Sequence, residues 1–419
     1  MQKLIPTLDK VVVTALFVFV AFCMFSISIT QIAGGIGGFA WLWRTKLTDS
    51  WKDQKWPLLV PFGLYILACL IAVANAYDPL YSAQEIKKLL EILIFFWVIN
   101  CVQEKKIRDL LVLILFASAT VAGLNGLYQI LTSMDNFVRI EGTMSVYMTY
   151  AGLLMIVGLM ALARLLYRRP QEPWLLVLLI IIMTCLVFTL TRQAWLGFFV
   201  GSMFFLFMWK KNFFVIIFLT ILVTVIFFKD EMKDEMHTLL MSEEKKLVST
   251  DTMYGFRKAL IVRFIEMARG KDQTFIMRKA LWQGGWEIFK DYPVTGCGFK
   301  CVDLVSDQYP DPTGLIKRLR GMHNNFLQLA VDTGIFGLSA WLGIWFCFFR
   351  LLRQRTLALE GESADQWVIF GGAATVIGFL GGGFFESNFY DSEVIMLVYF
   401  IMALSLTEFK NHFQKRVTN

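Results

Sequence analysis

Residues 174–209 read WLLVLLIIIMTCLVFTLTRQAWLGFFVGSMFFLFMW, and Arg192 is the one charged side chain in this stretch. A helix that crosses a bilayer needs about 20 predominantly apolar residues. An arginine at the centre of such a helix costs about 2.5–3.5 kcal/mol, and less at the membrane interface. The stretch therefore predicts two spanning helices, near 174–190 and 194–209, joined by a tight turn at Arg192.

The composition of the whole chain agrees with lipid as its solvent. Of the 419 residues, 57% are hydrophobic and 17% charged, whereas about a quarter are charged in a typical soluble domain. The net charge of +7 comes from short basic clusters between apolar runs. A nucleic-acid-binding protein would instead carry a continuous basic stripe, so the clusters are interpreted as topology signals.

Ten further apolar runs predict an all-α polytopic membrane protein with about 12 transmembrane helices. They lie near 9–25, 27–43, 57–76, 88–102, 108–131, 144–165, 213–228, 325–350, 366–385 and 392–407. The expected organisation has three parts. Residues 1–228 form about nine helices, residues 229–324 form one large loop with helical patterns such as Met277 to Phe289, and residues 325–419 form about three helices and a tail.

The orientation of the helices follows from the rule that Lys and Arg concentrate in short cytoplasmic loops. Alternate connections and the two termini hold 20 basic residues, against 4 in the intervening short connections. This predicts cytoplasmic termini and an extracytoplasmic, helical 229–324 loop. The prediction depends on a break between the first two helices at Gly34 to Gly38 or slightly earlier, because one long tilted helix there would invert everything downstream.

Several catalytic motifs are absent from the sequence. It contains no Gly-x-Ser-x-Gly elbow, no Walker loop, no His-Glu-x-x-His helix and no Gly-x-Gly-x-x-Gly motif after a strand. It also has no Asp-x-Asp set for a metal-bound nucleotide sugar and no zinc spacing among its seven cysteines. No cofactor or metal is expected, and an enzyme of this kind would bind its anionic substrate through arginine.

Three side chains stand out as candidates, each with a simpler alternative. His323, in Met322-His323-Asn324-Asn325, immediately precedes a predicted span and is either a catalyst or an interfacial cap. Arg192 is either a functional group or a headgroup anchor. Arg278 lies on an amphipathic segment of the loop, where a solvated or ion-paired role is the alternative.

The pattern His323-Asn324, nine residues, Gly334, two residues, Gly337 resembles the signature of bacterial O-antigen ligases, within the superfamily of O-antigen ligases and polymerases. Those proteins have about twelve spans, a large periplasmic loop before the histidine, one arginine at an earlier outer turn and a second in the loop. Arg192 and Arg278 occupy the corresponding places. The resemblance covers roughly residues 130–400.

The resemblance implies a glycosyltransferase of the bacterial inner membrane with its active site facing the periplasm. Its donor would be an undecaprenyl-diphosphate-linked glycan and its acceptor a sugar hydroxyl of lipid A–core. Arg192 and Arg278 would bind the diphosphate, because the guanidinium fork fits phosphate oxygens and keeps its proton. Neutral His323 would act as general base, and direct attack on the donor would invert the anomeric centre.

Secondary roles are expected for a few neighbours of these residues. Asn324 would orient the His323 ring or a sugar, and Arg139 would touch diphosphate or sugar unless it pairs with Glu141 or is only exposed. Gly334 and Gly337 would permit close helix packing. Glu386 and Asp391, which flank the last outer turn, either orient His323 or are hydrated turn residues.

Rival functions share parts of this pattern. An O-antigen or exopolysaccharide polymerase uses the same donor class, and a protein O-oligosaccharyltransferase is a third enzymatic reading. A lipid-linked glycan flippase or transporter also has about a dozen spans but needs neither an interfacial base nor a large outer loop. The glycan, the acceptor sugar and the oligomeric state are not encoded in recognisable motifs.

Two loop cysteines, in Cys297-Gly-Phe-Lys-Cys301, are predicted to form a disulfide. The periplasm is oxidising, and Gly298 allows a tight turn between them. Two free thiols are the alternative, because bonding requires the Cα atoms to lie about 4.4–6.8 Å apart.

Overall fold

The computed structural model describes residues 4–132, 139–168, 170–209, 273–309, 314–319, 321–358 and 365–409. The predicted span at 213–228 and residues 229–272 of the predicted loop lie outside the described residues. Within those ranges every regular element is a helix and there is no strand, which confirms the all-α class.

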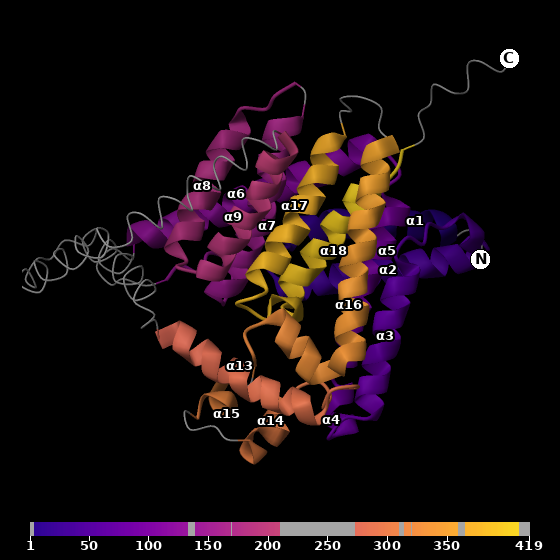
Figure 1. Cartoon of the computed structure of the whole chain (residues 1–419). Coiled ribbons are helices and arrows are strands. Elements are labelled where there is room, and N and C mark those ends of the chain that lie inside the picture. Colours follow the sequence, from indigo (N-terminus) through magenta and orange to yellow (C-terminus); the bar gives the residue numbers. More distant parts are fainter. Residues whose placement is uncertain are drawn as a thin grey trace, which may run out of the picture.

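The long and apolar helices form one bundle (Figure 1). They are α1 (Ile5–Phe22), α2 (Ile27–Leu47), α3 (Leu59–Ala74), α5 (Ile92–Cys101), α6 (Lys105–Thr132), α7 (Tyr147–Tyr167), α8 (Trp174–Phe188), α9 (Arg192–Trp209), α16 (Asn325–Ala358), α17 (Gln366–Gly382) and α18 (Ser392–Leu406). In the described part of the chain, α1, α6, α7 and α16 are long and apolar enough to cross a membrane, and α3, α8, α17 and α18 are shorter apolar helices. The number of about twelve spans stays a prediction.

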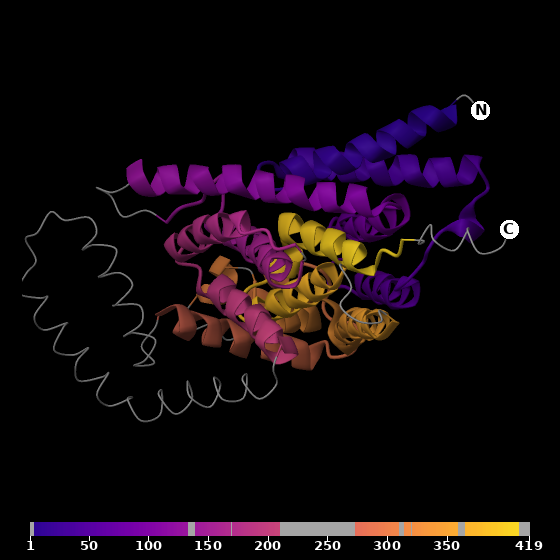
Figure 2. The same cartoon turned by 90° about the horizontal axis from the view of Figure 1, so that it is seen from above.

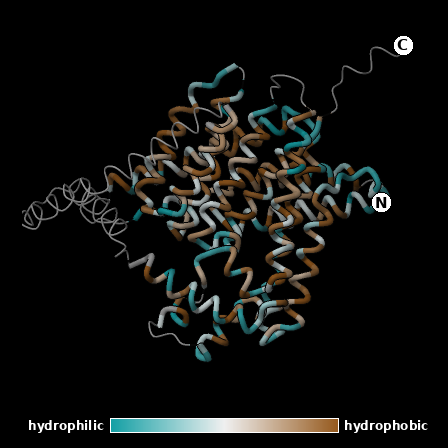
Figure 3. Tube along the Cα trace, in the orientation of Figure 1, coloured by the Kyte–Doolittle hydropathy of each residue, from teal (hydrophilic) through white to brown (hydrophobic). Residues whose placement is uncertain are grey.

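The centre of the bundle is formed by helices that are apolar on every side. In α18 all residues from Val394 to Leu406 are buried, and α7 is buried along most of its length. Helices α9 and α17 approach closely, because a Cβ on Gly197 or on Gly378 would lie within 3.0 Å of the carbonyl oxygen of the other glycine. Apolar residues fill the bundle and polar ones gather toward its two ends (Figure 3).

The first apolar stretch is divided into two helices, as predicted, slightly before the glycines. Helix α1 ends at Phe22, and Ser26 caps α2 by accepting a hydrogen bond from the Ile29 amide at 3.4 Å. The two helices lie side by side (Figure 2). Gly37 in α2 has a packing role instead, since a Cβ there would lie within 3.0 Å of the Trp97 ring.

Beyond one end of the bundle, α13 (Gln273–Asp291), α14 (Val302–Val305) and α15 (Leu315–Leu319) form a small unit that we call the cap (Figure 1). It has its own apolar core, which includes Leu281, Ile288, Val302, Val305 and Ile316. Helix α13 covers the helical pattern predicted from Met277 to Phe289. The segment after α3, with α4 (Pro79–Ala83) and the 3-10 helix Ile86–Glu91, also packs against the cap, which the sequence did not indicate.

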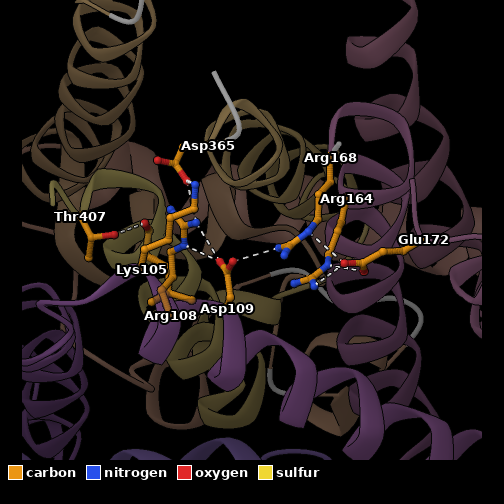
Figure 4. Close-up of polar contacts among 9 residues, drawn as sticks. Lys105, Arg108, Asp109, Arg164, Arg168, Glu172, Asp365 and Thr407 are labelled. Carbon is orange, nitrogen blue, oxygen red and sulfur yellow. Dashed lines mark hydrogen bonds and ion pairs between the residues drawn. The ribbon is translucent and has the colours of Figure 1, made fainter. Parts of the chain in front are cut away.

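A network of ion pairs lies at the other end of the bundle (Figure 4). Arg108 of α6 contacts Asp109 at 2.8 Å and Asp365, just before α17, at 2.7 Å. Arg164 of α7 contacts Glu172 at 2.8 Å, and Arg168 joins Asp109 to Glu172. The Arg108 and Arg164 side chains are 0% and 1% exposed. The three arginines, predicted only as topology signals, thus also tie α6, α7 and α17 together through these carboxylates.

Candidate active site

His323 lies in the short connection between α15 and α16. Its backbone has a φ of +45°, a left-handed conformation that is uncommon for a residue with a side chain. Asn324 follows and caps α16, because its Oδ1 accepts hydrogen bonds from the amides of Phe326 and Leu327 at 2.9 and 3.0 Å. Strained backbone that the surroundings hold in place is typical of functional sites.

The partner of His323 is Glu386, in the turn between α17 and α18. His323 Nδ1 lies 3.0 Å from Glu386 Oε1. The Ser387 amide donates to the same oxygen at 3.1 Å, and Gln193 Nε2, at the start of α9, donates to Oε2 at 3.2 Å. An ionised carboxylate only accepts hydrogen bonds, so beside an ionised Glu386 the Nδ1 atom is the donor, and in a neutral ring Nε2 then has the lone pair. This is the arrangement that a general base needs.

A second set of contacts holds the backbone that precedes His323. The Met322 amide donates to Gln328 Oε1 at 2.8 Å, and Trp282 Nε1 of α13 donates to the Met322 carbonyl at 3.0 Å. Gln328 Nε2 in turn donates to both carboxylate oxygens of Asp332 at 3.1 Å. The histidine is thereby fixed to the cap and to α16 together.

Helix α16 is interrupted at Gly334, whose φ of +64° and ψ of −167° are not helical. Residues 293–301, which we call the strap, take over the hydrogen bonds lost at this break. The carbonyls of Val331 and Asp332 accept from the amides of Cys297 and Gly298 at 2.9 and 3.1 Å.

On the other side of the break, the Ile335 amide donates to the Pro293 carbonyl at 2.9 Å. A Cβ on Gly334 would lie within 3.0 Å of the Val294 carbonyl oxygen. Gly334 therefore permits both the interruption and the close approach of the strap, beyond the helix packing predicted for it.

The strap ends in the predicted disulfide. Cys297 and Cys301 are bonded and buried, with Cα atoms 5.7 Å apart. The Phe299 amide, between them, donates to Ser82 Oγ of α4 at 2.8 Å. The Cys297 carbonyl accepts from the Tyr77 amide at 2.9 Å. The disulfide loop is thus anchored on the segment after α3.

His323 and Glu386 face a cavity of about 210 Å³ between the bundle and the cap. Its lining comes from five separate parts of the chain: Glu85, Lys88, Phe299, Lys300, Leu319, Gly321, His323, Gln328, Asp332, Glu386, Ser387 and Tyr390. The cavity combines a basic imidazole with cationic, acidic and aromatic groups. That combination suits a polar, charged ligand.

The cationic part of this lining is built on Glu85. Lys300 Nζ lies 2.7 Å from Glu85 Oε1, and Lys88 Nζ lies 3.1 Å from Oε2. Burial of the carboxyl opposes its ionisation, but Lys300 and Lys88 outweigh this and hold the pKa of Glu85 below its ordinary value. The hydrogen bond to Glu85 likewise raises the pKa of Lys300. Lys300 is therefore charged at neutral pH.

The predicted arginines lie outside this cavity lining. Arg192 is the first residue of α9, directly before Gln193, and is half-buried. Arg278 lies in α13 of the cap and is half-buried as well. The Arg139 guanidinium stacks over the Tyr147 ring at 4.6 Å. Arg192 is thus adjacent in sequence to the residue that holds Glu386, while no described contact joins Arg278 or Arg139 to His323.

Sequence reasoning raised Glu386 as a partner of His323 but missed Glu85, Lys88 and Lys300. Lys88 lies beside a short connection between two predicted spans, where lysines were interpreted only as topology signals. Lys300 is one of many basic residues in the predicted loop, and no motif distinguishes it. Asp391, the other acidic residue raised with Glu386, accepts a hydrogen bond from Thr149 at 2.6 Å, at the start of α7. The closeness of Glu85 and Lys300 depends on the strap's contact with α4, which no local pattern encodes.

Comparison with known families gives one finding for this chain. A family model described as O-Antigen ligase matches residues 175–342, a segment that includes α8, α9, the cap and His323. The search of curated proteins gives no match. With its several apolar helices, the chain is a multi-pass membrane protein. The match over residues 175–342 supports membership of the O-antigen ligase superfamily.

Proposed function

We propose that this protein is a glycosyltransferase that moves a glycan from an undecaprenyl-diphosphate-linked donor to a sugar hydroxyl of lipid A–core. The reaction takes place at the periplasmic face of the bacterial inner membrane. The observation that carries the proposal is the His323–Glu386 pair, which opens onto a cavity with room for polar substrate groups. The family match over residues 175–342 supports the wider class of O-antigen ligase or polymerase-like function.

In this reaction the acceptor hydroxyl loses its proton to His323 Nε2 as its oxygen attacks the anomeric carbon of the donor. The bond from that carbon to the diphosphate oxygen breaks, and the configuration at the carbon inverts. Glu386 keeps the ring in the productive tautomer and stabilises the imidazolium that forms. Gln193 and the Ser387 amide hold Glu386 in place, so the carboxylate does not need to reorganise during proton transfer.

The leaving diphosphate requires fixed positive charge. Arg192 stands at the N-terminus of the 18-residue helix α9, where the helix dipole also favours an anion. Arg192 and Arg278 are assigned to diphosphate binding, with their forks matching phosphate oxygens in place of a metal ion. Asn324 contributes by capping the helix beside the base. Arg139 is assigned a weaker role near the donor.

The decisive experiment is reconstitution of the full chain in lipid vesicles with a lipid-diphosphate glycan and, separately, lipid A–core, unlinked glycan repeats or a hydroxyl-bearing peptide. The expected product is lipid A–core extended by the glycan. Products that are longer glycans on the lipid carrier would assign a polymerase, and glycosylated peptide a protein O-oligosaccharyltransferase. Movement of unaltered donor between leaflets with no new bond would assign a transporter and reject the proposal.

A further inference from the structure

The disulfide loop carries a lysine in an unusual backbone conformation. Lys300 has a φ of +56°, in the left-handed region, and stands between Phe299 and Cys301. The left-handed conformation is energetically unfavourable for lysine, so the surrounding structure imposes it. The disulfide and the hydrogen bonds of the strap fix both sides of the residue. Strain of this kind points to a use for the side chain.

The Lys300 side chain reaches the cavity that contains His323. It is 52% exposed, and among the described residues its ammonium has one hydrogen-bond partner, Glu85. An ammonium group has three N–H donors, so two remain for another acceptor. Lys88 differs, because its ammonium also donates to the Tyr390 carbonyl at 3.2 Å and lies over the Tyr390 ring.

The two lysines that line the cavity therefore have different roles. Lys88 is 30% exposed and holds Glu85 and the Tyr390 backbone in place. The Glu85 side chain is 8% exposed, and its carboxylate positions the Lys300 ammonium by pairing with it. The other acidic groups of the lining have donors of their own. Asp332 accepts from Gln328 and from Tyr390, and Glu386 accepts from His323, Gln193 and the Ser387 amide.

From these observations we propose that Lys300 binds an anionic group of the substrate, a phosphate or a carboxylate, in the His323 cavity. The ammonium keeps one N–H on Glu85 and gives the other two to the anion. The proposal rests on the proposed function in taking a charged saccharide as the substrate of the cavity. It adds a recognition residue from the disulfide loop, separate from the two arginines. The anion belongs either to the lipid-diphosphate donor or to a phosphorylated acceptor.

The test uses the full chain in lipid nanodiscs and three single variants. Lys300→Asn removes the charge, and asparagine tolerates the left-handed backbone better than other residues with a side chain. Lys300→Arg keeps the charge. Lys317→Ala is the matched control, because Lys317 is also in the cap and pairs with Asp307 at 2.8 Å but does not line the cavity. Thermal unfolding of each variant establishes that it is folded.

Inorganic pyrophosphate is the binding probe, measured by calorimetry without any turnover. A hydrogen bond to a charged group is worth about 1.5–3 kcal/mol, so Lys300→Asn is expected to weaken binding by about 10- to 100-fold. Lys300→Arg should lose less than tenfold, and Lys317→Ala should bind like the wild type. Equal affinity in the wild type and in folded Lys300→Asn overturns the proposal.

Kinetics identify the source of the anion. A KM that rises in Lys300→Asn for the lipid-diphosphate donor alone assigns the donor. A KM that rises for a phosphorylated acceptor but not for its dephosphorylated form assigns the acceptor. If neither KM changes, the proposal fails even when transfer itself is intact. If the wild type transfers no glycan but binds pyrophosphate through Lys300, the proposed function fails while the anion site stands.

Discussion

His323 Nδ1 and Glu386 Oε1 lie 3.0 Å apart although 63 residues separate them in the sequence. The contact forms because the Asn325 amide just after the histidine donates to the Gly383 carbonyl at 2.7 Å, which docks the start of α16 on the end of α17. The Asn325 side chain strengthens this junction through Asn388 at 2.6 Å. These contacts hold the two connections that carry His323 and Glu386 next to each other.

His323→Ala is expected to insert and bind donor normally but to lose about 10²- to 10⁴-fold in transfer rate, the usual contribution of a general base. Glu386→Gln should lose less, because the imidazole remains and only its orientation and charge stabilisation are weakened. Single-turnover rates at saturating donor measure both. Glu287→Gln, an exposed change in α13, is the control. A folded His323→Ala protein with the wild-type rate would remove the histidine from the mechanism.

Arg192→Ala and Arg278→Ala are expected to raise the KM for the lipid-diphosphate donor while leaving insertion largely intact. Lysine at either position should restore activity only in part, since it keeps the charge but loses the bidentate fork. Turnover against donor concentration in reconstituted protein provides the measurement. Normal donor dependence in both alanine variants would show that neither guanidinium binds the diphosphate.

Gly334→Ala should lower the thermal stability of the protein strongly. The new Cβ would meet the Val294 carbonyl, and a positive φ costs a residue with a side chain about 1–3 kcal/mol in addition. Gly343→Ala, in the same helix, is the matched control, because a Cβ there has no neighbour within 4 Å. That change should leave the unfolding temperature the same or slightly higher. Equal unfolding of the two variants would contradict the interruption of α16.

The Cys297–Cys301 disulfide predicts a clear labelling pattern. In denatured protein that has not been reduced, a thiol reagent should modify the five cysteines that are free, and reduction should add the remaining two. Mass spectrometry of the labelled peptides assigns each site. Labelling of Cys297 and Cys301 before reduction would show that the bond does not form in the protein.

Arg108→Met should destabilise the bundle by about 1.5–3 kcal/mol, since it removes the buried cation that joins Asp109 to Asp365. These carboxylates then keep their described contacts to Arg168 and Lys105. Lys105→Met is the comparison. Lys105 also contacts Asp365, at 3.1 Å, but its side chain is 44% exposed, and an exposed pair is worth about 0–1 kcal/mol. Denaturant unfolding in detergent measures the difference. A smaller loss for Arg108→Met than for Lys105→Met would mean that the buried network does not tie the helices.

The sequence predicted those features that depend on local composition. Apolar runs located the helices, and the single Arg192 located the turn between α8 and α9. The contact between His323 and Glu386 was one of two alternatives considered for Glu386, the other being a hydrated turn residue. It could be considered because both residues flank predicted spans at the same membrane face. The disulfide could be anticipated from the spacing of Cys297 and Cys301.

Other features depend on tertiary contacts and could not be predicted in this way. Glu85 and Lys300 are more than 200 positions apart and meet only because the strap docks on α4. Gly334 looked like a small residue for helix packing, whereas its role depends on the carbonyl of Val294. The roles of Arg192, Arg278 and Arg139 stay predictions, since residue type alone does not state which anion each guanidinium meets.

The interruption of α16 has a consequence for the order in which the protein is made. Backbone groups without partners are costly in lipid, so a helix with a break at Gly334 is a poor substrate for insertion by itself. The strap, at residues 293–301, is synthesised before the segment that it completes. Synthesis therefore never produces the interrupted helix without the segment that supplies its missing hydrogen-bond partners.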